Sequence, residues 1–271
     1  MIRVTNRPRL VVMFVALLLA APAWAQKPPV PEPRLNQPGK DVQWVPTPAA
    51  LVEKMLDLAH VTSADRFVDL GSGDGVLVIA AAKRGAKARG IEYDRALVEL
   101  SKQRAAEAGV SERARFDRGD IFKKDFSDAT VVSTFLLPSM NLRLKPTFLA
   151  MAPGTRIVAN TFTIGDWEPD ESVTIDPCER WCKAMLWIVP ARVGGVWLTP
   201  RGELTVTQKA QTFSGTLGRE TIENGRLRGA DISFTAGGVA YSGRVDDDRI
   251  KLTATVDGKP VEWTLRPAPR R

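Results

Sequence analysis

The segment that decides the fold is Val68-Asp69-Leu70-Gly71-Ser72-Gly73-Asp74-Gly75, and an apolar stretch, Val76 to Ala82, follows it. This pattern predicts a buried strand, a tight turn through three glycines and then a helix. Glycine is needed in such a turn because the backbone adopts angles that a Cβ atom would forbid, and because a ligand must lie against the main chain. Open α/β sheets bind nucleotide-like ligands beyond the carboxyl end of a strand. The segment therefore predicts a cofactor site.

The spacing of the glycines indicates which cofactor binds. Dinucleotide-binding folds favour G-x-G-x-x-G, in which the helix faces a pyrophosphate, whereas here the third glycine comes one residue earlier. The carboxylate of Asp74 would repel a pyrophosphate but can attract a ligand that carries an ammonium group. The loop therefore favours S-adenosylmethionine, and NAD is the weaker alternative.

Two further sites follow in the order that an adenosyl cofactor requires. The stretch Lys87 to Tyr93 reads as a strand, and its Glu92 stands where a carboxylate can bind a ribose diol. A short strand, Ala114 to Phe116, precedes Asp120, which could accept from an adenine amino group beside the apolar Ile121. Three sites in the right order are a stronger signal than a lone glycine loop.

With these motifs the chain resembles the class I S-adenosylmethionine-dependent methyltransferases, through VDLGSGDG, GIEYD and GDIF. More narrowly, it is similar to the small protein-lysine methyltransferases that include the mitochondrial enzymes acting on the ATP synthase c-subunit and the adenine nucleotide translocase. The similarity covers roughly Trp44 to Pro169 and departs where Phe135 replaces an expected tyrosine and Asn160 an expected histidine. The stretches that carry it are Val45-Pro46-Thr47-Pro48, Phe135-Leu136-Leu137-Pro138 and Pro153-Gly154-Thr155-Arg156-Ile157-Val158.

This resemblance implies a methyltransferase that uses S-adenosylmethionine and acts on a protein lysine or a small amine. The acceptor side should be formed after the fourth strand, and Phe135 there could hold a methylammonium group by a cation–π contact or serve as a core aromatic. The implied acceptor residues are Thr134, Phe135, Leu137, Pro138 and Asn141. The implied cofactor residues are Asp69, Gly71, Gly73 and Asp74 for the methionyl end, Glu92 for the ribose, and Asp120 with Ile121 for the adenine.

The alternation of strands and helices predicts an α/β fold with a Rossmann-like, mainly parallel methyltransferase sheet. Thr47 before Pro48 predicts a capped helix start. The further strands are expected at Phe67 to Leu70, Ala129 to Phe135, Arg156 to Phe162, Ser172 to Ile175 and Ala184 to Val189, and the later helices at Arg95 to Ala108 and Met140 to Met151.

Composition and the first residues suggest four parts in the 271-residue chain. Residues 1–25 resemble a signal peptide, with a basic start, an apolar stretch and Ala23-Trp24-Ala25 before the cleavage point. Residues 26–43 form a proline-rich linker, residues 44–193 the cofactor-binding domain, and residues 194–271 a small antiparallel β module with a hairpin at Asp257-Gly258. No chemistry is visible in the module, which could be a structural cap, a dimer surface or a recruiter of substrate.

These features bound the location and the partners. The leader predicts a periplasmic or secreted protein with no lasting membrane anchor, although retention in the cytosol stays open. An exported binding protein that has lost catalysis is the alternative to an enzyme. The net charge of +7 includes three arginines of the leader, so +4 remains without it, and no nucleic-acid partner is predicted.

The two cysteines, Cys178 and Cys182, form a C-x3-C pair that could be a disulfide or two thiols. No metal site is predicted, because a zinc site wants four ligands and the chain has one histidine, His60, which is read as a helix-end residue.

Overall fold

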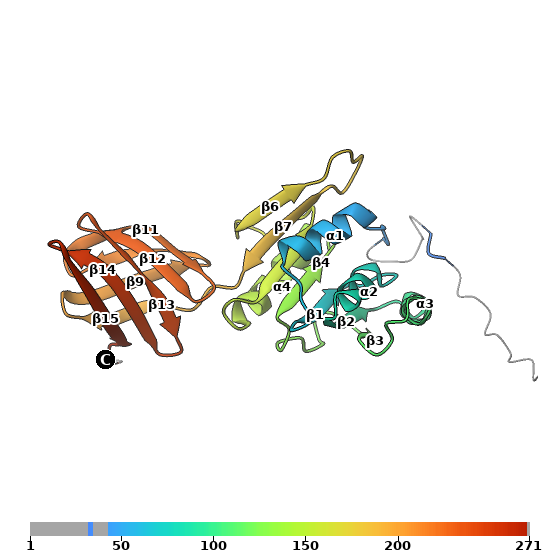
Figure 1. Cartoon of the computed structure of the whole chain (residues 1–271), viewed down its shortest axis with the longest axis horizontal. Coiled ribbons are helices and arrows are strands. Elements are labelled where there is room, and N and C mark those ends of the chain that lie inside the picture. Colours follow the sequence, from blue (N-terminus) through green and yellow to red (C-terminus); the bar gives the residue numbers. More distant parts are fainter. Residues whose placement is uncertain (1–31, 35–42, 270–271) are drawn as a thin grey trace, which may run out of the picture.

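The computed structural model describes residues 32–34 and 43–269, in which the chain forms two separate β-sheets with their own cores (Figure 1). A seven-stranded mixed sheet with flanking helices comes first, and a closed eight-stranded antiparallel barrel follows it. The α/β fold class with an appended β module is therefore confirmed. The predicted signal peptide and most of the predicted linker lie outside the described residues. Within the described part, no helix is long and apolar enough to span a bilayer.

The first sheet consists of β1 (Arg66–Leu70), β2 (Lys87–Glu92), β3 (Ala114–Arg118), β4 (Val131–Thr134), β5 (Arg156–Asn160), β6 (Glu171–Thr174) and β7 (Lys183–Ile188). Its strand order is β3-β2-β1-β4-β5-β7-β6. The strands β1 to β5 are parallel, and β7 runs antiparallel to both β5 and β6. The carboxyl ends of five neighbouring strands therefore share one edge of the sheet.

Helices cover both faces of this sheet and bury its strands. The helices α1 (Ala49–Leu58), α2 (Val76–Lys83) and α3 (Arg95–Glu107) pack on one face, where Phe67 and Val131 join their core. The opposite face carries α4 (Pro138–Ala150), whose Phe148 packs with Val68 and Val132. Neighbouring residues of one strand thus enter different cores, as the two-residue period of a strand requires.

The barrel consists of β8 (Gly195–Thr199), β9 (Gly202–Lys209), β10 (Thr212–Leu217), β11 (Glu220–Arg228), β12 (Asp231–Ala236), β13 (Val239–Asp246), β14 (Arg249–Val256) and β15 (Lys259–Pro267). Alternate side chains fill its interior, and β15 pairs with β8 to close it. The predicted hairpin between β14 and β15 is present, with positive φ at Asp257 (51°) and Gly258 (73°), as a two-residue hairpin turn of this kind needs.

Ion pairs join the barrel to the start of β6. Arg226 of the barrel contacts Asp170 at 2.9 Å, and Arg228 pairs with Glu171. Because β6 runs antiparallel to β7, which runs antiparallel to β5, β6 has the same direction as the parallel strands. Its first residue therefore lies at the edge opposite their carboxyl ends. The barrel contacts the sheet at this amino-end edge.

Two helix starts differ from the sequence prediction. Thr47 does not cap α1: the helix begins at Ala49, Pro48 occupies the N-cap position, and no side chain caps it. Thr47 stands one residue too early, and its hydroxyl instead accepts a hydrogen bond from Asn160 Nδ2 (3.4 Å). The fourth helix begins at Pro138 rather than Met140, because the fixed φ of proline suits the first helical turn.

Candidate active site

The glycine turn after β1 forms a backbone cradle. Gly71, Gly73 and Gly75 all have positive φ, at 74°, 54° and 82°. A Cβ atom at Gly71 would lie 3.0 Å from the Leu136 side chain. The Oγ atom of Ser72 is buried in this turn without a hydrogen-bond partner. The turn thus has an exposed main chain at Gly71 and an orphaned hydroxyl at Ser72, which a ligand can satisfy.

Glu92 ends β2 and braces this turn. Its carboxylate accepts hydrogen bonds from the N–H groups of Gly73 (2.9 Å) and Asp94 (2.8 Å). Burial raises the pKa of Glu92, against the effect of these hydrogen bonds. Each carboxylate oxygen still has a second lone pair, so the group can also accept from a ribose diol.

Asp69 lies beneath the turn and is almost fully buried. Its carboxylate accepts from Ser133 Oγ at 2.6 Å. Burial, with Glu92 and Asp74 nearby, raises the pKa of Asp69 to about 7 despite the Ser133 hydrogen bond. A cationic ligand beside Asp69 would favour its ionised form.

The other two predicted cofactor positions have local partners of their own. Asp74 pairs with Arg104 of α3, which also contacts Glu32. Asp120 accepts from the N–H of Phe122 (2.9 Å), and the neighbouring Ile121 is buried in the core of the α4 face. The assignments of Asp74 to the methionyl end and of Asp120 with Ile121 to adenine stay predictions.

The predicted acceptor residues lie at the end of β4, directly after it and in α4, and two of them have unsatisfied oxygens. Thr134 Oγ1 and Asn141 Oδ1 are both buried without a hydrogen-bond partner. The Nδ2 atom of Asn141 faces the carbonyl oxygens of Leu136, Phe162 and Thr163 at 3.5, 3.4 and 3.3 Å. Its Oδ1 atom is therefore the free acceptor. Among the remaining acceptor residues, Phe135 is half-buried, while Leu137 and Pro138 are exposed at the start of α4.

Sequence reasoning missed three aromatic side chains at this end of the sheet. The Trp44 indole lies over the glycine turn, because a Cβ atom at Gly73 would come within 3.0 Å of it. Phe162 and Trp181 both pack against Phe135. The signal for Trp181 was its place in the turn of the predicted antiparallel edge pair, which had to project from the carboxyl-end edge. Trp167, in the loop after β5, does not join these three aromatic residues, because it packs against Trp187 in the core.

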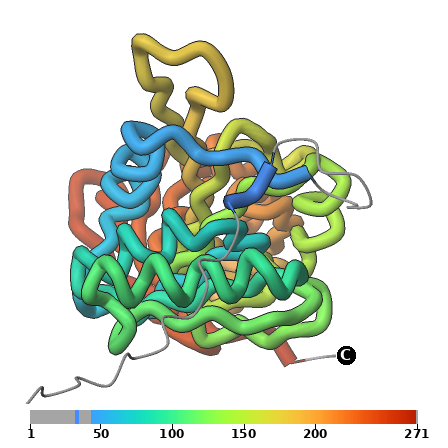
Figure 2. Tube along the Cα trace, turned by 90° about the vertical axis from the view of Figure 1, so that its right-hand side faces the viewer, coloured from blue at the N-terminus to red at the C-terminus, as the bar shows by residue number. Residues whose placement is uncertain are grey.

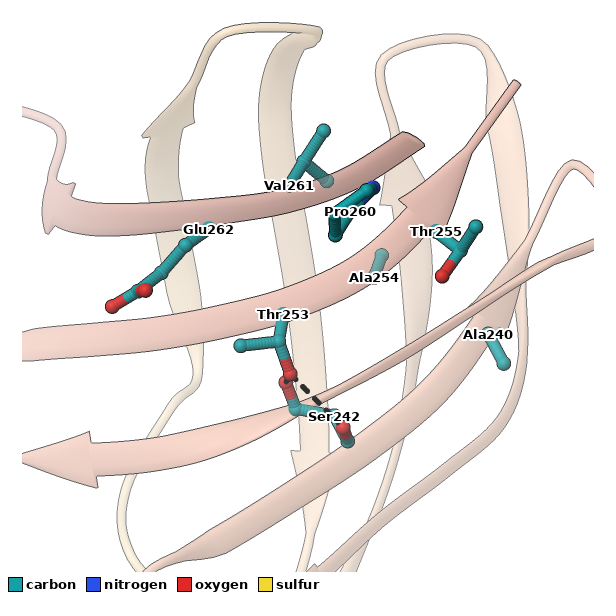
Figure 3. Close-up of a pocket in the computed structure, with 8 residues that line it drawn as sticks. All are labelled: Ala240, Ser242, Thr253, Ala254, Thr255, Pro260, Val261 and Glu262. Atoms are coloured by element: carbon teal, nitrogen blue, oxygen red, sulfur yellow. Dashed lines mark hydrogen bonds between the residues drawn. The ribbon is translucent and has the colours of Figure 1, made fainter. Parts of the chain in front are cut away.

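A hollow on the barrel shares none of these residues. It lies on β13, β14 and β15, where Ser242 and Thr253 are hydrogen-bonded to each other at 3.3 Å (Figure 3). Its lining consists of small, hydroxyl and aliphatic residues with one carboxylate, Glu262, and includes none of the predicted cofactor or acceptor residues. The chemistry is therefore placed at the sheet edge.

The residues at that edge fit S-adenosylmethionine. The buried Oγ atom of Ser72 and Oγ1 atom of Thr134 have no hydrogen-bond partner, so a polar ligand can satisfy them. Glu92 and Asp69 provide carboxylates at the turn, where the cofactor offers hydroxyl and ammonium donors. A pyrophosphate would place further negative charge against these acids, which argues against the NAD alternative.

Comparison with known proteins gives the same result. The family model of the ANTKMT methyltransferase domain matches residues 69–171. A protein-lysine N-methyltransferase of Saccharolobus islandicus is 39% identical over 138 residues, which are 50% of this chain and 86% of that protein. The ATP synthase c-subunit lysine N-methyltransferase of Mus musculus is 41% identical over 107 residues, which are 39% of this chain and 43% of the mouse enzyme.

A solved structure agrees with these relatives. The RNA methyltransferase from Salinibacter ruber, in complex with S-adenosyl-L-homocysteine, is 42% identical, with a TM-score of 0.52 over 55% of this chain and 96% of that one. The barrel lies beyond the residues that the family model matches. The chain is thus an S-adenosylmethionine-dependent methyltransferase and belongs to the family that contains these small protein-lysine N-methyltransferases.

Proposed function

We propose that the enzyme transfers the methyl group to the side-chain amine of a lysine in a protein substrate. The observation that carries the proposal is a pair of buried, unsatisfied oxygens, Thr134 Oγ1 at the end of β4 and Asn141 Oδ1 in α4. An amine offers N–H donors that can satisfy such acceptors. The relatives named as lysine methyltransferases support this choice of acceptor.

The side chains around the acceptor suit the chemistry of an amine. A lysine must lose its proton to water before it attacks, and an apolar surrounding promotes this loss because burial disfavours the ammonium form. Asn141 Oδ1 and Thr134 Oγ1 can then accept two N–H bonds and orient the nitrogen lone pair. Bound S-adenosylmethionine supplies an activated methyl group, whose carbon–sulfur bond breaks as the nitrogen–carbon bond forms, with the electron pair returning to sulfur. The protein contributes mainly proximity and alignment, worth several kcal/mol.

The test is methyl transfer from radiolabelled S-adenosylmethionine by the full chain. The acceptors offered are a protein extract, free lysine and total RNA, each with the wild type and with Asp69→Ala. We expect label in methyl-lysine after acid hydrolysis of the protein, and none with the variant. Label only in RNA, or only in a small amine, would overturn the proposal of a protein lysine.

We also propose that the mature enzyme works outside the cytosol, in the periplasm or as a secreted protein. The predicted signal peptide supports this location, and so does the disulfide between Cys178 and Cys182, a bond that persists in oxidising compartments. N-terminal sequencing of the protein from the exported fraction should find Gln26 as the first residue. An intact leader on a protein confined to the cytosol would contradict the proposal.

A further inference from the structure

The turn between β6 and β7 stands at the acceptor edge of the sheet. The strand β6 has the direction of the parallel strands, and β7 begins beside the end of β5, with Asn160 opposite Ala184. Residues 175–182 therefore project beyond the edge that carries the glycine turn and the acceptor residues. Figure 2 shows this hairpin, in yellow, standing clear of the body of the protein.

Three aromatic rings meet below this turn, and each comes from a different segment. Phe135 follows β4, Phe162 follows β5, and Trp181 belongs to the hairpin turn. The centroid of the Trp181 ring lies 5.5 Å from that of Phe135 and 5.6 Å from that of Phe162, and the two phenylalanine centroids are 6.1 Å apart. All three residues are half-buried. Phe135, Phe162 and Trp181 together are called the aromatic wall.

The backbone has an unusual conformation at two residues that set the direction of these rings: Thr161, which precedes Phe162, and Trp181 itself. Thr161 and Trp181 both have φ of 60°, a left-handed conformation that is rare for a side chain with a branched or bulky Cβ. The N–H of Thr161 donates to the Lys183 carbonyl at 2.7 Å, which ties the end of β5 to the hairpin. Such conformations persist where surrounding contacts enforce them, and they are concentrated at functional sites.

A disulfide between residues on either side of Trp181 crosslinks the turn. The disulfide joins Cys178 to Cys182, the residue directly after the tryptophan, and the N–H of Ile175 donates to the Cys182 carbonyl at 2.9 Å. Without the disulfide, the hydrogen bonds of the strand ends would remain but the turn itself would have no crosslink. The disulfide therefore restricts the positions that the indole can take.

The aromatic wall lies next to Asn141 of the acceptor site through the main chain of Phe162. Asn141 Nδ2 faces the carbonyl oxygen of Phe162 at 3.4 Å, while its Oδ1 atom lacks a partner. The rings touch one another, so a cation has no room between them and must lie on their open faces. The face of an aromatic ring carries the negative part of its quadrupole and attracts a cation.

We propose that Trp181, positioned by the Cys178–Cys182 disulfide, determines specificity for an alkylammonium group on the acceptor side. The aromatic wall receives the charged nitrogen of the incoming or methylated amine on its open face, beside Asn141 Oδ1. The proposal rests on an amine being the acceptor, as in the proposed function. It adds a binding surface that lies partly beyond the residues matched by the family model.

The test compares a cation with its neutral carbon isostere. Choline and 3,3-dimethylbutan-1-ol have nearly the same shape and differ in the charge of the quaternary centre. Their binding to the full chain loaded with S-adenosylhomocysteine can be followed by NMR titration. We expect the wild type to prefer choline by about tenfold, which is the size of a partly desolvated cation–π contact. Equal binding of the two probes would overturn the proposal.

Two substitutions of Trp181 separate its ring from its bulk. Trp181→Phe keeps an aromatic face and should keep most of the preference for choline, whereas Trp181→Leu keeps only apolar volume and should lose it. A double variant, Cys178→Ser with Cys182→Ser, should also reduce the preference, because the indole is no longer held. Affinity for S-adenosylhomocysteine should stay unchanged in all three and serves as the control for folding. Full preference for choline in Trp181→Leu would contradict the assignment.

Turnover distinguishes this proposal from the proposed function. If the wild type methylates a lysine, Trp181→Leu should raise the KM for that substrate several-fold and leave kcat nearly unchanged. Lysine methylation with the same KM in this variant would overturn the proposed role of Trp181 in binding the ammonium group, while the proposed lysine methyltransferase function would still hold. A Trp181-dependent preference for choline in a protein that methylates no lysine would overturn the proposed function, while the proposed cation-binding role of Trp181 would still hold.

Discussion

Substituting Gly75 with alanine should destabilise the cofactor domain far more than the same change at Gly109. Both glycines have positive φ, at 82° and 68°, so alanine at either one costs about 1–2 kcal/mol for the left-handed backbone. At Gly75 the new Cβ would also lie 2.8 Å from the buried Phe116 ring and 2.9 Å from the Ser101 Cβ. Forcing these groups apart adds about 1–3 kcal/mol. No atom lies within 4 Å of a Cβ at Gly109.

Thermal unfolding with and without S-adenosylhomocysteine measures this difference. The sheet domain and the barrel can unfold separately, so the relevant transition is the one that the ligand raises. For a domain of this size each kcal/mol lowers that midpoint by about 2–4 °C. The midpoint of this transition should therefore be well below that of Gly109→Ala in the Gly75→Ala variant. Gly75→Ala should also bind the ligand more weakly, because α2 and the glycine turn must shift. Equal losses in the two variants would refute the contact with Phe116 as the cause.

Three other predictions concern buried polar groups. The pKa of Asp69 is raised to about 7 from its usual 3.8, so between these pH values the folded protein holds a proton that the unfolded chain has lost. The free energy of unfolding should therefore fall as the pH rises through that window. Urea unfolding at pH 4.5 and 7.5 should show a smaller fall in Asp69→Asn than in the wild type. Asn141→Leu should lower kcat/KM for an amine about tenfold, through loss of a hydrogen bond, while calorimetry finds S-adenosylhomocysteine binding unchanged. Burial alone would raise the pKa of Asp65, but hydrogen bonds from Thr62 and Thr130 and the Arg156 guanidinium outweigh it, so the pKa is lowered. The stabilisation that the ionised carboxylate gives is therefore lost as the pH falls below about 4. In urea unfolding at pH 7, Asp65→Asn should lower the free energy of unfolding by about 2–4 kcal/mol.

The local signals in the sequence were sufficient for the cofactor side of the fold. Glycines at a strand end and the alternation of apolar strands with helices depend on nearby residues, so the turn at residues 71–75 and the seven strands could be predicted. Glu92 was predicted by its distance from the turn, and its hydrogen bond to Gly73 N–H places it there in the structure.

Features that depend on distant parts of the chain could not be predicted. Closure of the barrel requires β15 to pair with β8, and no local pattern encodes that pairing. The meeting of Phe135 with Phe162 and Trp181 depends on left-handed backbone at Thr161, where a β-branched residue gives no such signal. Thr47 carried a strong capping signal, yet the pairing of its hydroxyl with the distant Asn160 was not visible in the sequence.

The ion pairs at the amino-end edge of the sheet limit how far the enzyme can be shortened. The side chain of Asp170 is fully buried; its oxygens accept from Arg226 of the barrel and from the N–H of Ile188. A chain that ended at residue 193 would lose that guanidinium, and water would reach the sheet edge that the barrel now covers. The family domain in this protein thus shares an ion pair and a covered sheet edge with its barrel, and a shortened chain would leave Asp170 with the Ile188 N–H and water as its donors.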